Sequence, residues 1–146
     1  MYFRNREDAG RKLASLLTKY RGRDAVVFAL PRGGVVLGVE VAAALDVPLD
    51  LVIPRKIGHP VNPEYAIAAI TEHGDLACNE VEIAMIDPAW FRSQQVNERR
   101  EAQRRRDLYM NGRKEHSAAN RIAILVDDGI ATGLTMRAAA RGTIPL

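Results

Sequence analysis

Cysteine is nearly absent from this chain of 146 residues, since Cys78 is its single thiol. No intrachain disulfide can form, and none of the three histidines stands at a metal-ligand spacing from that thiol. Hydrophobic runs never approach the roughly 18 residues of a membrane-spanning helix, and charged residues stand among the first eight, where a signal peptide would be apolar. These absences predict a cytoplasmic protein without a disulfide, a protein metal cage or a membrane partner.

Aromatic residues are also scarce, at 5% of the chain, and few accompany the densest positive charge. Residues 92–121 carry nine basic and four acidic side chains, with Tyr109 as the one aromatic. Because single-stranded nucleic acids are held largely by stacking on aromatic rings, nucleic acid is not the favoured partner. The arginines of 99–106 are either a solvated helix face, on which Glu101 reaches arginines three and four positions on, or a surface for polyphosphate or nucleic acid.

What the sequence does contain is typical of a soluble globular protein. Hydrophobic residues make up 47% and charged residues 27% of the chain. The length predicts one domain covering residues 1–146. Short apolar strands alternate with amphipathic helices, which predicts an α/β fold with an open, Rossmann-like parallel sheet flanked by helices.

The expected elements follow from apolar spacing and from turn and capping residues. Ala9 to Tyr20 repeat apolar residues at helical spacing, and Asp87 with Pro88 starts a long helix. The expected ranges are a helix at 9–20, a strand at 25–30, a turn at 31–34, a helix at 35–45, a strand at 49–53, a loop at 55–64, a hairpin of 66–70 and 76–79, a long basic helix at 88–110, a strand at 121–126 and a helix from 136. The hairpin and the basic helix are thus inserted before the last strand.

The candidate ligand-binding residues lie at the junction between that last strand and the last helix. Asp127 and Asp128 end the strand, and a loop of small residues leads into the helix. Ligands of open α/β sheets bind at the carboxyl ends of strands, and the N–H groups at a helix start attract phosphate. Gly129 and Gly133 allow close backbone approach and positive φ angles. Carboxylates repel phosphate, so neighbouring sugar hydroxyls suit them better. The alternative is an ordinary turn with a capping aspartate.

Ile124–Thr135 resembles the binding motif for 5-phosphoribosyl 1-diphosphate (PRPP) of type I phosphoribosyltransferases. In that motif, two acids on a hydrophobic strand precede a loop of Gly, Ala/Thr, Thr/Ser, Gly and Thr. The resemblance implies that Asp127 and Asp128 hold the ribose 2′- and 3′-hydroxyls and that the loop binds the 5′-phosphate. The loop residues are Gly129, Ile130, Ala131, Thr132, Gly133, Leu134 and Thr135. The Gly-Lys-Ser/Thr ending of a Walker-type loop is absent.

A wider resemblance links the chain to a poorly characterised bacterial branch of this family. The segments that carry it are Pro31–Gly34, Arg55–Gly58 and Asn62–Glu64. It implies that Arg32, Gly33 and Gly34 contact the pyrophosphate, and a guanidinium suits that task. Arg55 and Lys56 could add positive charge there. The two glycines could instead only form a tight turn, and the two cations could be ordinary solvated loop residues.

The resemblance implies an enzyme that transfers the phosphoribosyl group of PRPP to a small-molecule nitrogen acceptor, such as a nucleobase, and releases pyrophosphate. Asp127, Asp128 and Arg32 would be its catalytic residues, and Mg²⁺ would be bound mainly through PRPP. Two rivals stay open: a noncatalytic PRPP-sensing or RNA-binding regulator, and an inactive fragment. The family continues beyond the position of Leu146 through further helices and strands, so we expect an incomplete sheet and marginal stability or a homo-oligomer.

Overall fold

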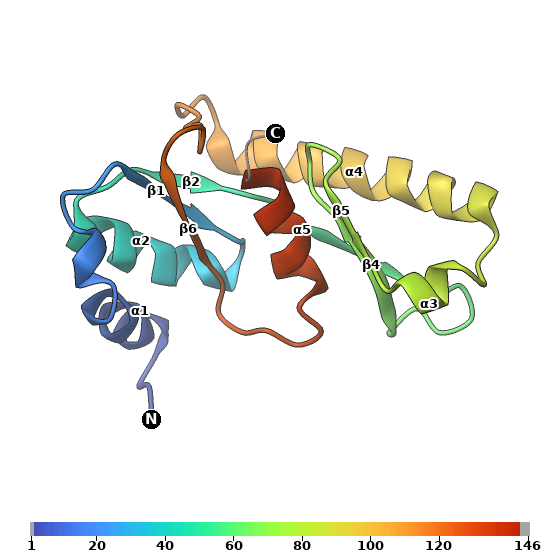
Figure 1. Cartoon of the computed structure of the whole chain (residues 1–146), viewed down its shortest axis with the longest axis horizontal. Coiled ribbons are helices and arrows are strands. Elements are labelled where there is room, and N and C mark those ends of the chain that lie inside the picture. Colours follow the sequence, from blue (N-terminus) through green and yellow to red (C-terminus); the bar gives the residue numbers. More distant parts are fainter. Residues whose placement is uncertain (1, 144–146) are drawn as a thin grey trace. The chain divides into compact units, whose positions relative to one another are not determined.

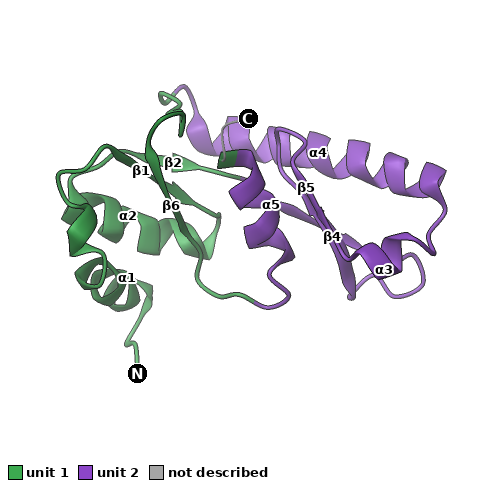
Figure 2. Cartoon of the chain, viewed as in Figure 1, with its two compact units in different colours: residues 1–52, 113–130, 143–146 green, residues 53–112, 131–142 purple. Residues whose placement is uncertain are grey.

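The structure is a computed structural model and describes residues 2–143. Its backbone contacts divide the chain into two compact units (Figure 2). Unit 1 comprises residues 1–52, 113–130 and 143–146, and unit 2 comprises residues 53–112 and 131–142. Both units contain helices and strands (Figure 1), which confirms the predicted α/β class.

Unit 1 is built on a three-stranded parallel sheet. β1 (Ala25–Ala29) lies between β2 (Leu49–Leu51) and β6 (Ile122–Val126). All five residues of β1 are buried, as its unbroken apolar sequence predicts. Ala29 pairs with Val126, so β1 and β6 end side by side at the same edge of the sheet. The segments that follow these two strands therefore begin as neighbours.

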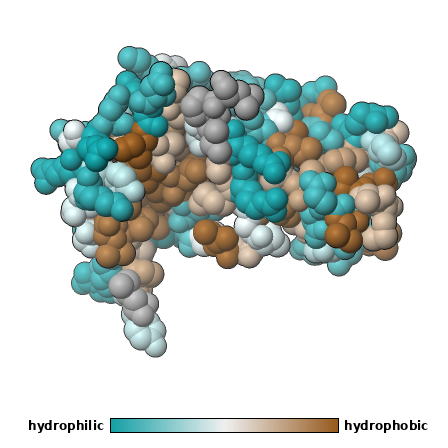
Figure 3. Space-filling model, in the orientation of Figure 1, coloured by the Kyte–Doolittle hydropathy of each residue, from teal (hydrophilic) through white to brown (hydrophobic). Residues whose placement is uncertain are grey.

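β6 is an edge strand of this sheet within residues 2–143, because β1 is its only partner there. Its first four residues are only half-buried. In Figure 3, hydrophobic side chains gather on the part of unit 1 where Figure 1 places β6. An apolar strand thus has one side of its backbone and part of its side-chain surface uncovered by unit 1.

Two helices, α1 (Arg6–Ser15) and α2 (Gly33–Leu45), pack with the sheet of unit 1. The prediction that the first helix continues to Tyr20 is wrong, because the α-helix ends at Ser15 and a 3₁₀ turn, η1 (Thr18–Tyr20), follows. Leu17 and Tyr20 still pack on the core, so the apolar spacing persists after the helix has ended. The buried members of this core are Ala14, Val27, Leu37, Val41, Ala42, Leu45 and Val126.

Unit 2 is built on an antiparallel sheet of β3 (Arg55–Gly58), β4 (Ala66–Ile70) and β5 (Leu76–Cys78). The predicted hairpin of β4 and β5 is confirmed. The predicted loop at 55–64 is wrong at its start, because 55–58 forms β3 and pairs with β4. Gly58 lies at a shift in that pairing, and a side chain there would collide with the Pro63 backbone. Because this strand has only four residues and ends at a break in the pairing, its own sequence gives little indication that a strand forms.

Helices cover both faces of this second sheet. α4 (Pro88–Met110) packs on one face through Phe91, while α5 (Leu134–Thr143) packs on small residues of the other through Leu134 and Ala138. The predicted cap of α4 is present, with Asp87 accepting a hydrogen bond from the Ala89 N–H at 3.2 Å. A short helix, α3 (Glu80–Ile83), was not predicted, and α5 begins two residues earlier than expected. Across residues 2–143, no helix has both the length and the apolar character to cross a membrane.

Candidate functional site

The two motif acids lie in unit 1, directly after β6. Asp127 is half-buried and Asp128 is exposed. The backbone N–H of Asp128 donates to Oδ1 of Asp127 at 2.8 Å, which fixes the turn between them. The strand end therefore presents two carboxylates at the carboxyl edge of a parallel sheet, where ligands of this fold class bind.

Gly33 and Gly34, at the start of α2, pack directly against these acids. A side chain on Gly33 would overlap Oδ2 of Asp128. A β-carbon on Gly34 would lie 2.8 Å from the Val126 carbonyl oxygen and 3.1 Å from Cα of Asp127. The two glycines thus do more than form a turn: they let the segment after β1 approach the segment after β6 closely.

Arg32 precedes these glycines and is exposed. The peptide bond between Pro31 and Arg32 is cis. The N–H of Gly34 donates to the Leu30 carbonyl at 3.1 Å, so this N–H is engaged within the protein. The contribution of Gly34 is therefore its lack of a side chain, whereas Arg32 offers a solvent-accessible guanidinium at the same sheet edge.

Arg6, in the first turn of α1, contacts the candidate site, although nothing in the sequence indicated this contact. Its Nε and Nη2 atoms donate to Oδ2 of Asp128 at 3.2 and 2.9 Å. These hydrogen bonds lower the pKa of the Asp128 carboxyl below its ordinary value, against a smaller opposing effect of burial. No spacing in the sequence indicates a contact between Arg6 and Asp128, which are 122 positions apart. In the sequence, Arg6 is an ordinary charged residue in a first helical turn.

The predicted phosphate loop passes from one unit to the other. In unit 1, Gly129 and Ile130 are exposed, and a β-carbon on Gly129 would meet nothing within 4 Å. In unit 2, Gly133 has φ +81°, the left-handed conformation for which glycine is suited. Oγ1 of Thr132 accepts the Leu134 N–H at 3.3 Å and so caps the start of α5.

The two predicted loop cations, Arg55 and Lys56, lie on β3 in unit 2, and strand alternation points them to opposite faces. Nε of Arg55 donates to Glu98 of α4 at 2.8 Å, so its charge is already paired. Lys56 is exposed and stands opposite Ala69, on the face of the sheet that α5 covers. Of these two cations, Lys56 has the more accessible charge.

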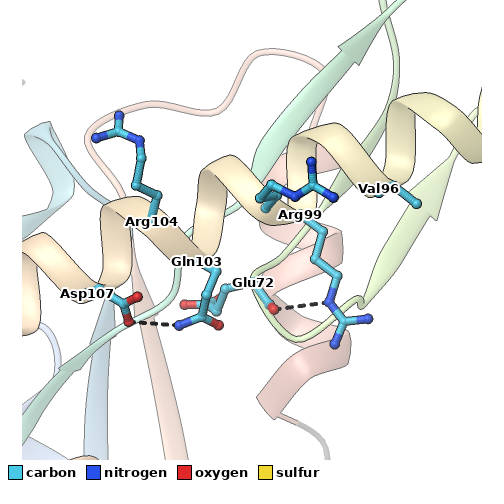
Figure 4. Close-up of a pocket in the computed structure, with 7 residues that line it drawn as sticks. Glu72, Val96, Arg99, Gln103, Arg104 and Asp107 are labelled. Carbon is cyan, nitrogen blue, oxygen red and sulfur yellow. Dashed lines mark hydrogen bonds between the residues drawn. The ribbon is translucent and has the colours of Figure 1, made fainter.

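A cavity of about 620 Å³ in unit 2 is lined by none of the predicted site residues. It runs along α4 (Figure 4) and is bordered by three arginines and two acids. Nε of Arg99 donates to the Glu72 carbonyl at 3.3 Å, and Arg104 and Arg105 both bind Glu101, as the helical spacing predicted. These bonds hold the pKa of Glu101 at about 2. Two of the three arginines that border the cavity, Arg99 and Arg104, thus already bind protein acceptors.

Comparison with known proteins decides the family. A model of the phosphoribosyl transferase domain matches residues 2–144. The chain belongs to the phosphoribosyl transferase family. Two provisionally named phosphoribosyl transferases of Mycobacterium tuberculosis, Rv0571c of strain H37Rv and MT0597 of strain CDC 1551, are each 43% identical to it over 141 residues. The resemblance inferred from the PRPP motif is therefore confirmed at the level of family.

The lengths of these phosphoribosyl transferase relatives differ from that of the chain. The alignment covers 95% of the chain and 32% of each mycobacterial protein, so the chain spans about a third of their length. The crystal structure of TT1426 from Thermus thermophilus has 38% identity and a TM-score of 0.80, and the match covers 98% of this chain and 69% of that one. At this identity and score, the chain shares the fold of TT1426 over nearly its whole length.

Proposed function

We propose that this phosphoribosyl transferase domain binds PRPP at the carboxyl edge of the β2–β1–β6 sheet and transfers its phosphoribosyl group to a nitrogen nucleophile. Asp127 and Asp128 hold the ribose 2′- and 3′-hydroxyls. Residues 129–135 bind the 5′-phosphate. The segment Arg32–Gly34 receives the diphosphate.

The packing of Gly33 against Asp128 carries this proposal. In PRPP the diphosphate is attached to C1′, which is bonded to C2′ with its hydroxyl. A protein that holds both groups must therefore place its hydroxyl acceptor and its diphosphate segment next to each other. Gly33 and Asp128 meet this requirement, although they come from different strand ends far apart in the chain.

The reaction follows from these positions. A nitrogen lone pair of the acceptor forms a bond to C1′ while the bond from C1′ to the diphosphate oxygen breaks, and pyrophosphate leaves with that electron pair. Positive charge develops on the sugar ring as the bond breaks. The carboxylates of Asp127 and Asp128 fix the ring and lie near that charge, and the Arg32 guanidinium stabilises the departing anion.

Magnesium fits this arrangement as part of the substrate complex. Among residues 2–143, no three His, Cys, Asp or Glu side chains gather into a group that could hold a metal ion. Mg²⁺ prefers oxygen ligands and retains water, which the diphosphate, the ribose hydroxyls and solvent supply. When bound, the ion neutralises charge on the leaving group.

Calorimetric titration with PRPP, with and without Mg²⁺, tests the proposal. We expect magnesium-dependent binding, followed by pyrophosphate release when the accepted nucleobase is added from a panel. Absence of PRPP binding by the folded chain would refute the proposed site. Binding without turnover on any nitrogen acceptor would refute the transfer step and leave a PRPP-binding regulator.

A further inference from the structure

We propose that Arg6 is a specificity-determining residue that joins the ribose-binding carboxylate to the diphosphate segment and so makes the site prefer PRPP over ribose 5-phosphate. This inference rests on the proposed function and deepens it. It assigns a role to α1, an element that carries none of the residues predicted from the motif.

The geometry places Arg6 between the two parts of the candidate site. Its guanidinium donates through Nε and Nη2 to the same oxygen, Oδ2 of Asp128. The same Nε would lie 3.0 Å from a β-carbon on Gly33. Arg6 therefore touches the carboxylate assigned to the ribose and lies against the backbone assigned to the diphosphate. All three residues belong to unit 1.

The start of α1 is held in place by several polar contacts, so Arg6 is presented from a fixed backbone. Asn5 caps the helix by accepting the Asp8 N–H at 2.8 Å. Asp8 in turn accepts the Arg4 N–H at 3.0 Å and pairs with Lys12 at 3.1 Å. With its backbone fixed, the exposed Arg6 side chain loses less freedom when it binds Asp128 than it would on a mobile terminus.

Charge explains why this position matters for a diphosphate. Asp127 and Asp128 suit hydroxyl groups but repel the anionic group attached to the neighbouring sugar carbon. The positive charge of Arg6 offsets the negative charge of Asp128. The planar guanidinium of Arg6 also keeps further N–H donors that do not bind Asp128. A ligand without the 1-diphosphate has no group for these donors to stabilise. The benefit of Arg6 should therefore appear with PRPP and be small with ribose 5-phosphate.

The test compares three variants by calorimetric titration with PRPP and with ribose 5-phosphate, both with Mg²⁺. Arg6→Gln removes the charge, Arg6→Lys keeps it without the fork, and Arg11→Gln is the control. Arg11 lies on the same helix, is 55% exposed against 58% for Arg6, and also pairs with an acid, Glu40, at 3.8 Å. The carboxyl titration of Asp128, followed by NMR in the ligand-free protein, provides a readout that needs no ligand.

We expect Arg6→Gln to weaken PRPP binding at least about tenfold, as loss of a charge-assisted hydrogen bond would, while ribose 5-phosphate binding changes much less. Arg6→Lys should recover part of the loss, and Arg11→Gln should match the wild type. The pKa of Asp128 should rise in Arg6→Gln only. Equal losses for both ligands, unchanged affinity or tighter PRPP binding would overturn the inference. A folded wild type that binds neither ligand would instead overturn the proposed function and, with it, the preference.

Discussion

The α-carbon of Gly33 faces the carboxylate of Asp128 so closely that any side chain at position 33 would overlap Oδ2. This contact joins the segment after β1 to the segment after β6. It requires glycine because of the neighbouring side chain, since Gly33 is not among the residues with positive φ. The candidate site therefore depends on a packing relationship as well as on its charged groups.

Glycine-to-alanine variants distinguish an effect of this packing on PRPP binding from an effect on the stability of the fold. In Gly33→Ala the obstacle is the end of a flexible side chain, so Asp128 can move aside, and we expect weaker PRPP binding with little loss of stability. In Gly34→Ala the obstacle is backbone, with the Val126 carbonyl oxygen at 2.8 Å, so we expect a lower melting temperature. Gly129→Ala is the control for the melting temperature alone, because its β-carbon meets nothing within 4 Å. Equal melting temperatures for all three variants would contradict this packing.

Asp128→Asn tests the ribose assignment. The variant keeps the size of the side chain but loses the negative charge that strengthens hydrogen bonds from the ribose hydroxyls, so PRPP affinity should fall roughly tenfold or more. Because Asp128 is exposed, the melting temperature should stay close to that of the wild type. Unchanged affinity in a folded variant would exclude Asp128 from ribose binding.

Acid should loosen the start of α1. The Arg4 N–H, and then Lys12, hold the pKa of the Asp8 carboxyl at about 2, below its ordinary value of 3.8. A depressed pKa contributes stability that is complete above the unfolded value and is lost as pH falls through the folded one. Melting temperatures measured from pH 5 to pH 2 should therefore fall more steeply in the wild type than in Asp8→Asn. Parallel curves would show that Asp8 is not preferentially ionised in the folded state.

The buried ion pair of unit 2 should be essential to its stability. Nη1 of Arg106 lies 3.1 Å from Oε2 of Glu72, and the two side chains are 5% and 0% exposed. Glu72 also accepts the Ile53 N–H. Arg106→Met would leave a buried carboxylate without its cation, which costs about 3–5 kcal/mol. Urea unfolding of this variant should show a large loss, and the exposed control Arg104→Gln should show little. Similar unfolding curves for the two variants would contradict a stabilising role for the ion pair of Arg106 and Glu72.

Self-association should accompany the half-buried edge strand β6. Exposed edges pair readily with other strands, and uncovered apolar surface adds a driving force. Sedimentation velocity over a wide concentration range should reveal oligomers that form as concentration rises. A monomer at every concentration, with a high melting temperature, would contradict this expectation.

Local signals in the sequence were sufficient for much of the fold. The unbroken apolar run of β1, the Asp87 cap of α4 and the acids that end β6 all depend on neighbours along the chain. The errors arose where the outcome depends on tertiary contacts. The strand at 55–58 exists because β4 pairs with it, and the α-helix that starts at Arg6 ends before its apolar spacing does.

The candidate site divides in the same way. Asp127 and Asp128 were identified from the strand, acids and loop that surround them in sequence. The contact of Gly33 with Asp128 and the hydrogen bonds from Arg6 join positions that only folding brings together. A single sequence contains no local pattern for such pairs, so their part in the site became visible only in three dimensions.

NMR of the backbone amides during PRPP titration with Mg²⁺ maps the proposed PRPP site residue by residue. We expect the resonances of residues 32–34 and 127–135 to shift in proportion to binding, while those of 96–107, along the α4 cavity, stay unchanged. Shifts confined to the α4 cavity, with the two strand ends unaffected, would contradict the proposed site.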